Sequence, residues 1–344
     1  MTFINKTLRK IGLAVLALLV FAPFSLIYNQ TAEVESKVVV KSIKEKSKKY
    51  YKKLKGENET SAEKSITVDA KVNISLCVEE GNLKITGWER NEIRAFIHDG
   101  SAVGFKIREK NKQNSIVWLM VTGSDPAKNK NANSEECLSG ENIELDVPRG
   151  AAVDVKGSTR QTTITAIRKT VVKIVGGDIF LNNIEQGIHA TTYEGNVTVE
   201  NSGGAVSLET SNGNIVAFDV AASDIGDVFK ARTSSGAITL QSVGHRQTEI
   251  NSNSGSIKFA GAFQNAGQYI FHTQNGTISL AVPEKSSFKI NASYGFGAFS
   301  SELKLENIIK NNSSRAQSLS ALMGNGDATV NLTTASGAIR IRKQ

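Results

Sequence analysis

Cysteine, proline and histidine are scarce in this sequence of 344 residues, which contains two, four and four of them, respectively. The two cysteines lack the Cys-x-x-Cys spacing, which argues against a thiol redox motif or a cysteine-ligated metal. Glycine, by contrast, occurs 29 times, so the turns rely on its freedom to adopt positive φ. Apolar residues make up 40% of the chain and charged residues 22%, proportions that are ordinary for a folded protein.

The sequence also lacks a basic excess outside its N-terminal part. Of the 41 Lys and Arg and the 33 Asp and Glu residues, 13 and 6 lie in residues 1–64, which leaves 28 and 27 in the remainder. Recognition of a phosphate backbone requires many cationic contacts along one surface. The near-neutral remainder therefore argues against nucleic acid as a partner.

An uncharged apolar run lies close to the N-terminus. Ile11–Ile27 follows three cationic residues within positions 6–10, the arrangement of a secretion signal or a membrane anchor. As a helix, these 17 residues would rise about 26 Å, slightly less than the ~30 Å hydrocarbon core of a bilayer. A cleaved signal and an uncleaved span both stay open. We expect residues 1–32 to be a signal peptide or membrane anchor, and the rest of the chain to lie outside the cytoplasm.

Residues 33–65 form a second N-terminal segment that is rich in lysine. Nine lysines and one acidic residue lie between Lys37 and Lys55, and self-repulsion keeps such a segment extended or loosely helical. A solvated, flexible linker is the favoured interpretation. The alternative is an arm that contacts anionic lipid, since each lysine near such headgroups gains about 1 kcal/mol.

From about Ile66 onward a short phrase recurs, in which a glycine precedes alternating residues. In an extended strand the second and fourth residues after each glycine share one face, and these are Leu, Ile, Val or Phe, with the small Ala217 as the exception. Helical periodicity fails in this region. The pattern predicts short β-strands with one buried face. The phrase starts at Gly81, Gly177, Gly195, Gly204, Gly213, Gly236, Gly255, Gly276 and Gly337.

The spacing of these phrases indicates how the strands are arranged. From Gly177 to Gly276 the intervals are 18, 9, 9, 23, 19 and 21 residues, which fits a unit of about 20 residues holding two strands. One unit cannot bury its own apolar face, so stacking of neighbours predicts an all-β solenoid or β-roll over residues 66–344. A closed β-sandwich is the alternative. Gly81 and Gly337 are more isolated outer copies of the phrase.

Several of these segments resemble a known family. Gly81–Trp88 followed by Asn91–Phe96 is similar to the opening of the bacterial putative-adhesin family of β-strand-repeat proteins, long catalogued as a domain of unknown function; Pro283–Ser293 and Gly326–Ile341 resemble it as well. The resemblance covers roughly residues 66–344. It implies an extracytoplasmic β-solenoid or roll, adhesion by analogy, and no catalytic motif.

Two segments depart from the pattern of that family. Tyr294–Phe299 stands where a Thr-Ser-Gly turn is more usual, and Glu306–Asn325 is a polar insertion. The number of repeats near the C-terminus is therefore open.

Cys77 and Cys137 lie 60 positions apart in a chain that we expect to leave the reducing cytoplasm. A disulfide between them would contribute about 2–4 kcal/mol by constraining the unfolded chain. Two unpaired thiols, with Cys77 as a core residue, are the equally weighted alternative.

The titratable residues show no catalytic constellation. No histidine is spaced from another as adjacent metal ligands are, and turn aspartates, although a solenoid-type polysaccharide lyase or hydrolase could use them, are common at turns without any chemistry. Gly176–Asp178 begins like a calcium-binding nonapeptide, but the next residues do not continue it. We therefore predict no catalytic, metal or cofactor residues. The residues considered are His98, His189, His245, His272, Asp178, Asp219, Asp224 and Asp227.

The water-facing strand positions of the central repeats have no aromatic ladder of the kind that stacks on sugars. Tyr193, Tyr269, Phe271 and Tyr294–Phe299 are expected in the core or in a cap of the stack. Aromatic residues therefore do not indicate a ligand platform.

Two classes of function remain. The favoured one is a non-catalytic, adhesin-like binding or structural module tethered at the cell envelope, whose partner is an envelope protein, a polymer or a second copy of the chain. The alternative is an envelope enzyme that acts on polysaccharide. An enzyme needs a converged acid–base pair, whereas binding does not, so the sequence favours the binding module.

Overall fold

The computed structural model describes residues 62–124, 137–223, 226–312 and 317–344. The chain divides into two compact units, Met1–Glu59 and Thr60–Gln344, and all described residues belong to the second. The expected N-terminal helix, the signal or anchor (residues 1–32) and nearly all of the Lys-rich linker lie outside the described residues. Within the described part of the chain every regular element is a strand, as predicted. That part contains no helix with the length and hydropathy that crossing a membrane requires.

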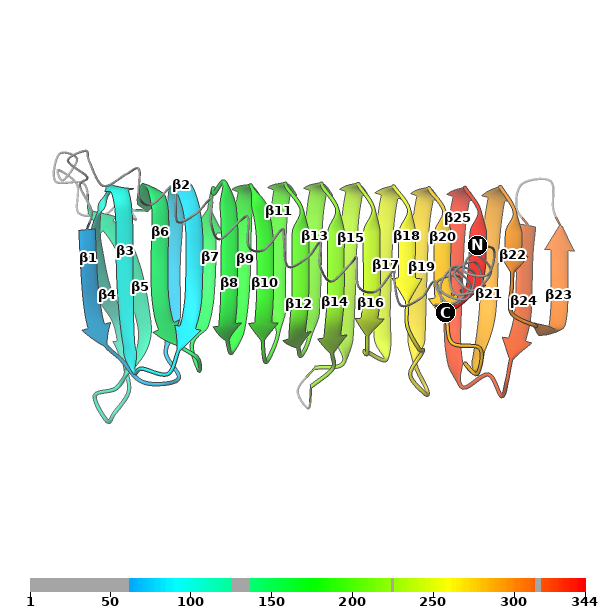
Figure 1. Cartoon of the computed structure of the whole chain (residues 1–344), viewed down its shortest axis with the longest axis horizontal. Coiled ribbons are helices and arrows are strands. Elements are labelled where there is room, and N and C mark those ends of the chain that lie inside the picture. Colours follow the sequence, from blue (N-terminus) through cyan, green and yellow to red (C-terminus); the bar gives the residue numbers. More distant parts are fainter. Residues whose placement is uncertain (1–61, 125–136, 224–225, 313–316) are drawn as a thin grey trace, which may run out of the picture. The chain divides into compact units, whose positions relative to one another are not determined.

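The middle of this unit is a stack of two-stranded rungs (Figure 1). In each rung one strand lies in a first sheet and the next lies in a second sheet, and strands of successive rungs pair in parallel. The first-sheet strands are β7 (Ala152–Gly157), β9 (Lys169–Gly176), β11 (Ile188–Glu194), β13 (Val206–Asn212), β15 (Val228–Ser235), β17 (Gln247–Ser254) and β19 (Gln268–Asn275). The second-sheet strands are β8 (Gln161–Ile167), β10 (Asp178–Ile184), β12 (Val197–Gly203), β14 (Ile215–Ala221), β16 (Ile238–Val243), β18 (Ile257–Ala260) and β20 (Ile278–Val282).

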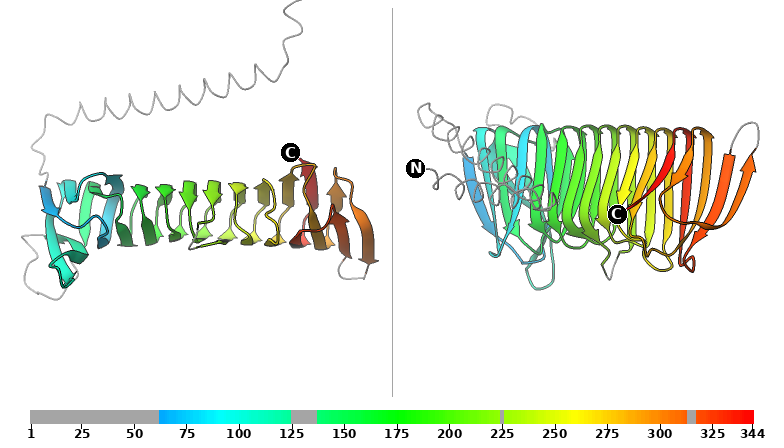
Figure 2. Two further views of the ribbon diagram at one scale, coloured as in Figure 1. Left: turned by 90° about the horizontal axis from the view of Figure 1, so that it is seen from below. Right: turned by 45° about the vertical axis from the view of Figure 1, so that its right-hand side comes forward.

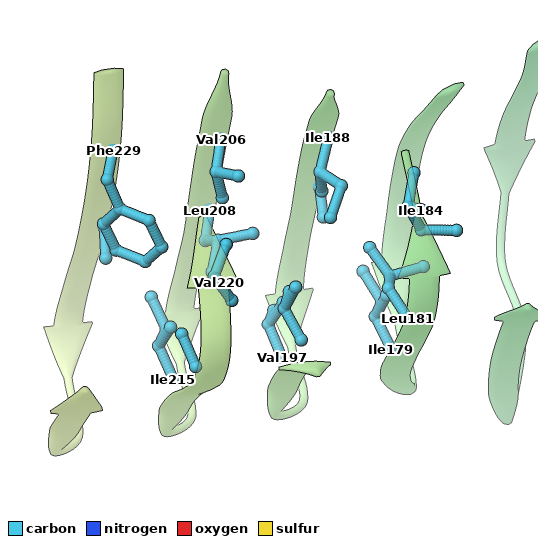
Figure 3. Packing of buried hydrophobic residues seen from close by; sticks show 14 of the residues in the cluster. Ile179, Leu181, Ile184, Ile188, Val197, Val206, Leu208, Ile215, Val220 and Phe229 are labelled. Carbon is cyan, nitrogen blue, oxygen red and sulfur yellow. The ribbon is translucent and has the colours of Figure 1, made fainter. Parts of the chain in front are cut away.

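The core lies between the two sheets and repeats from rung to rung. Ile188, Val206 and Phe229 are opposite one another on β11, β13 and β15, and all three are buried. Figure 3 shows these side chains facing Val197 and other inward residues of the second sheet. The alternation read from the sequence therefore identifies the buried face correctly, including the small Ala217, which is 1% exposed.

The glycines of the phrases, apart from Gly204, occupy the corner where a rung passes from the first sheet to the second; Gly204 lies at the return from β12 to β13. A Cβ at Gly213 would lie 2.0 Å from the carbonyl oxygen of Gly195 in the preceding rung, so only glycine fits that close approach. Thr210 Oγ1 donates a hydrogen bond to the same oxygen, at 2.9 Å. The inward threonine hydroxyl and the glycine carbonyl at the corner are thus hydrogen-bonded to each other. The same bond recurs from Thr192, Thr233, Ser252, Thr273 and Thr334 to the corner glycine of the neighbouring rung.

A second repeated bend lies near the end of the second-sheet strands. There the residue that breaks the alternation has a positive φ in rung after rung, as at Asn201 (47°) and Asp219 (50°). Asn and Asp tolerate this left-handed conformation better than most residues. The bend returns the chain toward the first sheet.

At the N-terminal end the order in space differs from the order in sequence. β2 bends at its middle and forms the rung beside β7 and β8, while β5 and β6 pair with its other side (Figure 1). Antiparallel β4 then closes the first sheet, and β3 and β1 close the second. These strands are β1 (Ala62–Thr67), β2 (Asn73–Trp88), β3 (Glu92–Gly100), β4 (Ala102–Lys110), β5 (Ile116–Ser124) and β6 (Leu138–Pro148).

The C-terminal end has the same kind of insertion. The last strands of the chain, β25 and β26, lie between β19–β20 and β21–β22, as the red strand among yellow and orange ones shows in Figures 1 and 2. β24 and β23 follow as antiparallel strands beyond β21. The strands are β21 (Phe288–Phe296), β22 (Phe299–Ser301), β23 (Glu306–Asn312), β24 (Gln317–Met323), β25 (Ala328–Ser336) and β26 (Ile339–Lys343).

The two segments that depart from the family pattern take part in this arrangement. A Cβ at Gly297 would lie 1.9 Å from the carbonyl oxygen of Gly337, so Tyr294–Phe299 forms the corner of the rung made by β21 and β22. The polar insertion Glu306–Asn325 contains the two antiparallel strands β23 and β24. Both segments therefore belong to the C-terminal end of the stack.

Two sequence-based expectations differ from the structure. β1 begins at Ala62 rather than near residue 66, and four of its six side chains are exposed, so an apolar alternation could not mark it. Tyr193 is 57% exposed in a central rung, in neither the core nor a cap, whereas Phe296, 85% exposed, lies in the segment at the C-terminal end of the stack. Both lie beside a glycine corner, where the inward alternation ends. Tyr269, Phe271 and Tyr294 are buried as expected.

Candidate functional site

The outer face of the first sheet carries the clearest candidate binding surface in the described part of the chain. Parallel pairing places one outward residue of each strand in a row across the sheet, and strands spaced about 4.8 Å apart make this row a continuous track. We call it the outer row. It contains Ser75, Asp154, Val171, His189, Ser207, Lys230 and Glu249.

A hollow lies at the N-terminal end of the outer row, and we call it the Trp118 hollow. It is lined by residues of β2, β4, β5 and β7, including Trp118, Met120, Asp154 and Lys156. Alternation along β5 buries Leu119 and Val121 and turns Trp118 and Met120 outward. The hollow thus has an aromatic and apolar wall on β5 and a charged wall on β7.

Cations predominate around the Trp118 hollow. Arg108 lies over the Trp118 ring, with its guanidinium carbon 6.0 Å from the ring centroid, and Lys156 lines the opposite side. Asp154 is the acidic lining residue, and its Oδ1 is buried with no hydrogen-bond partner among the described residues. A buried carboxylate oxygen without a donor has a desolvation cost that a ligand hydroxyl would relieve.

A second, shallower hollow follows farther along the outer row, and we call it the Lys230 hollow. Its lining includes Lys169, His189, Ser207 and Lys230. Beside it, Lys230 Nζ lies 3.4 Å from Glu249 Oε2, and Asn251 donates a hydrogen bond to the other carboxylate oxygen of Glu249 at 3.0 Å. Four strand spacings separate Asp154 from Lys230, so the two hollows lie roughly 19 Å apart along one track.

His98, Asp99 and Glu141 form the group of described residues best suited to hold a metal ion. His98 Nδ1 lies 3.4 Å from Asp99 Oδ2 and 3.9 Å from Glu141 Oε2, and one ligand atom from each of the three lies within 4.8 Å of the others. Sequence spacing could not reveal this group, because Glu141 is 43 positions after His98. It meets His98 only through the pairing of β3 with β6.

The other histidines take different positions. His189 and His272 face outward from β11 and β19 in the first sheet. His245 is fully buried, with its Nε2 2.7 Å from the carbonyl oxygen of Gly204. A carbonyl only accepts hydrogen bonds, so Nε2 carries the proton. Burial lowers the pKa of His245, against the opposing effects of that bond and of Asp227, so the ring is neutral and structural near pH 7.

Neighbouring residues hold His245 and its segment in place. Tyr269 donates its hydroxyl hydrogen bond to the His245 carbonyl at 3.0 Å, and burial raises the pKa of Tyr269. Asp227 accepts hydrogen bonds from the backbone and the guanidinium of Arg246. Burial acts to raise the pKa of Asp227, but these bonds outweigh it and lower the pKa below its ordinary value. This cluster closes a corner of the stack and does not form an acid–base pair.

The aspartates considered as lyase or hydrolase residues do not come together. Asp178 lies at the start of β10 and Asp219 near the end of β14, while Asp227 is bound to Arg246. Asp224 lies outside the described residues. Asp178 Oδ1 instead accepts hydrogen bonds from the backbone and the side chain of Asn196, so the Gly176–Asp178 turn uses its carboxylate to hold the next rung.

Cys77 and Cys137 form a disulfide in the structure, the first of the two alternatives left open by the sequence. Cys77 is half-buried and points outward from β2 rather than into the core. It also lines the Trp118 hollow. The bond therefore joins the candidate site to the start of β6.

Sequence reasoning missed Trp118, Arg108 and Asp154 as candidate binding residues. All four residues of Trp118–Val121 are apolar, so the sequence has no apolar–polar alternation there to reveal which side chains face outward. Phe180 and Phe218 do face outward from β10 and β14, but they lie in different rows, with Phe180 opposite Thr198 and Phe218 opposite Glu200, so they form no aromatic ladder.

Comparisons with known proteins give one family and one solved structure. The model of the family described as Toastrack DUF4097 matches residues 33–342. The chain is also similar to a solved structure titled as a putative cell adhesion protein from Clostridium sporogenes ATCC 15579, with 11% identity and a TM-score of 0.26, covering 83% of this chain and 100% of that one. No curated protein matches.

Proposed function

The chain belongs to the Toastrack DUF4097 family, and from that premise we propose that it is a non-catalytic, adhesin-like binding module of the cell envelope. This membership agrees with the resemblance to β-strand-repeat proteins seen in Gly81–Trp88 and Asn91–Phe96. We further propose that it acts outside the cytoplasm, held or exported by residues 1–32. In this proposal Lys37–Lys55 serves as a spacer that can also contact anionic lipid.

The Trp118 hollow is the observation that carries the proposal. An aromatic ring, two cations and one carboxylate oxygen that lacks a donor lie around one concavity. Aromatic faces pack against apolar faces of ligands, and Arg and Lys pair with carboxylates. This combination fits an anionic sugar in an envelope polysaccharide, whose carboxylate would meet Arg108 and Lys156 and whose hydroxyl would donate to Asp154.

The outer row extends this site to a chain-like ligand. The row continues across four strand spacings to Lys230, through the apolar Val171 and the polar His189 and Ser207. A polymer lying across the strands can therefore contact both hollows. Binding at two places on one rigid face raises affinity without a deep pocket.

An envelope polysaccharide enzyme is the alternative function, and the geometry favours it less. Hydrolysis of a glycosidic bond uses two carboxyl groups about 5–10 Å apart across the scissile bond. Asp154 is the carboxylate in the lining of the Trp118 hollow. The arrangement therefore supports binding over cleavage.

The proposal is tested by measuring retention of soluble polysaccharides on the immobilised full-length protein. We expect a uronate-containing polymer to bind, and a neutral glucan of equal length to bind at least 10-fold more weakly. Trp118→Ala and Lys156→Ala should each weaken binding about 10-fold, or about 1.4 kcal/mol. Tyr193→Ala is the matched control, because Tyr193 is an exposed aromatic residue outside both hollows.

Three results would contradict the proposal. Equal binding of both polymers, or unchanged binding by Trp118→Ala, would remove the hollow as the site. Release of new reducing ends by the wild type, lost in Asp178→Ala or Asp219→Ala, would establish the enzyme instead.

A further inference from the structure

We propose that His98, Asp99 and Glu141 form a binding site for a zinc-type divalent cation at the end of the β3–β6 pair. Such a site is separate from the proposed polysaccharide surface, because it lies on the second sheet. No feature of the Trp118 hollow contributes to it.

Strand pairing brings the three side chains together. β3 and β6 are antiparallel, with His98 opposite Asn142 and Gly100 opposite Gly140. Asp99 and Glu141, which lie between these two pairs, are therefore on facing segments of the two strands. The two glycines permit this close approach, since a Cβ at Gly100 would lie 2.0 Å from the Ser139 carbonyl oxygen.

The backbone at Asp99 completes the convergence. Neighbouring residues of a regular strand point to opposite faces, which would separate Asp99 from His98. Asp99 instead has a φ of 45°, which breaks the alternation. Its carboxylate consequently lies 3.4 Å from His98 Nδ1.

The negative charges of Asp99 and Glu141 favour a bound cation. Two carboxylates this close together on neighbouring strands repel each other. A divalent ion between them would replace this repulsion with two attractions and would also bind the imidazole nitrogen. The three ligand atoms already lie within 4.8 Å of one another.

The ligand types and distances favour Zn²⁺ over Ca²⁺ or Mg²⁺. Imidazole nitrogen is a ligand of zinc and of other late first-row metals, whereas calcium and magnesium prefer oxygen alone. Tetrahedral zinc with ligands at 2.0–2.1 Å requires ligand atoms about 3.3 Å apart. The observed 3.4 Å and 3.9 Å need only a small adjustment of the flexible Glu141 side chain.

The site is buried at His98 and open to solvent at the two carboxylates. The His98 side chain is 10% exposed, whereas those of Asp99 and Glu141 are 47% and 35% exposed. Water can therefore supply the fourth ligand. A bound ion would link the ends of β3 and β6 near Cys137, which stabilises the N-terminal end of the stack.

The test is a zinc titration of the full-length protein, in competition with a chromogenic chelator. We expect one site per chain, and an affinity lowered about 100-fold or more by His98→Ala or Glu141→Gln, since even changes around metal ligands cost 10–100-fold. His272→Ala is the control, as His272 lies on the first sheet. Co²⁺ bound at the same site should give the strong visible absorption of a tetrahedral complex.

Glu141→Gln keeps the test decisive if His98→Ala fails to fold, because its side chain is partly exposed and changes by one atom. Slower hydrogen exchange at the β3–β6 end upon zinc addition, absent in Glu141→Gln, would further support the site. The proposal is overturned if both variants bind zinc like the wild type, or if 1 mM Ca²⁺ displaces zinc from the protein.

Discussion

At the scale of single residues, the glycine corner brings the backbones of neighbouring rungs very close together. A Cβ at Gly213 would lie 2.0 Å from the Gly195 carbonyl oxygen and 2.6 Å from its carbon, and these backbone atoms of the preceding rung are held by strand pairing and cannot move away. We predict that Gly213→Ala lowers the free energy of unfolding by about 3 kcal/mol or more, as other severe overpacking does. Urea denaturation followed by circular dichroism measures this change.

Gly244→Ala serves as the control for this prediction. The nearest atoms to a Cβ at Gly244 are 3.9 Å away, an ordinary contact distance. Its unfolding free energy should therefore stay within about 1 kcal/mol of the wild type. Equal effects of the two substitutions would show that the close approach at the corner does not limit stability.

The sequence identified these glycines, but it assigned them to turns alone. A turn explains why glycine is needed, whereas the hydrogen bond from Thr210 to Gly195 connects two rungs. Such a partner lies in another rung and has no local signature. For the same reason Asp99 and Glu141 could not be paired from the sequence, and the outward direction of Trp118 required knowledge of the register of β5.

At the scale of elements, the regular rungs were predictable and the inserted ones were not. The central strands follow one another in sequence and in space, so their spacing is visible as a period. β2 pairs with β5, which comes later in the chain, and β25 pairs with β19, which comes much earlier. Gly81 and Gly337 therefore read as isolated outer copies, although both lie in rungs inside the stack.

The disulfide fixes one of these insertions, because it joins β2 to the residue before β6. We predict that the double variant Cys77→Ser, Cys137→Ser loses about 2–4 kcal/mol of stability. Denaturation of the wild type with and without a reductant should show the same loss, and the double variant should not respond to the reductant. Alkylation of both thiols in the unreduced protein, detected by mass spectrometry, would contradict the bond.

At the scale of the described unit, stability is shared between neighbouring rungs, and the ends must be closed. A stack of this kind approximates a sum of rung and interface energies, and unpaired strand edges promote association between molecules. The period in the sequence predicts the stack itself. It could not predict the closures, because β1, β3, β4, β23 and β24 are antiparallel strands with no repeat signature.

The C-terminal insertion gives the sharpest test of this closure. A chain that ends at Gly326 lacks β25 and β26, so β19, β20, β21 and β22 each lose a pairing partner. We predict that this variant aggregates, as measured by light scattering after size-exclusion chromatography. A chain without Met1–Glu59 retains the whole second unit and should stay soluble. The prediction is contradicted if the variant ending at Gly326 stays soluble and unfolds cooperatively. The intrinsic stability of the remaining rungs would then exceed the free-energy cost of their open strand edges.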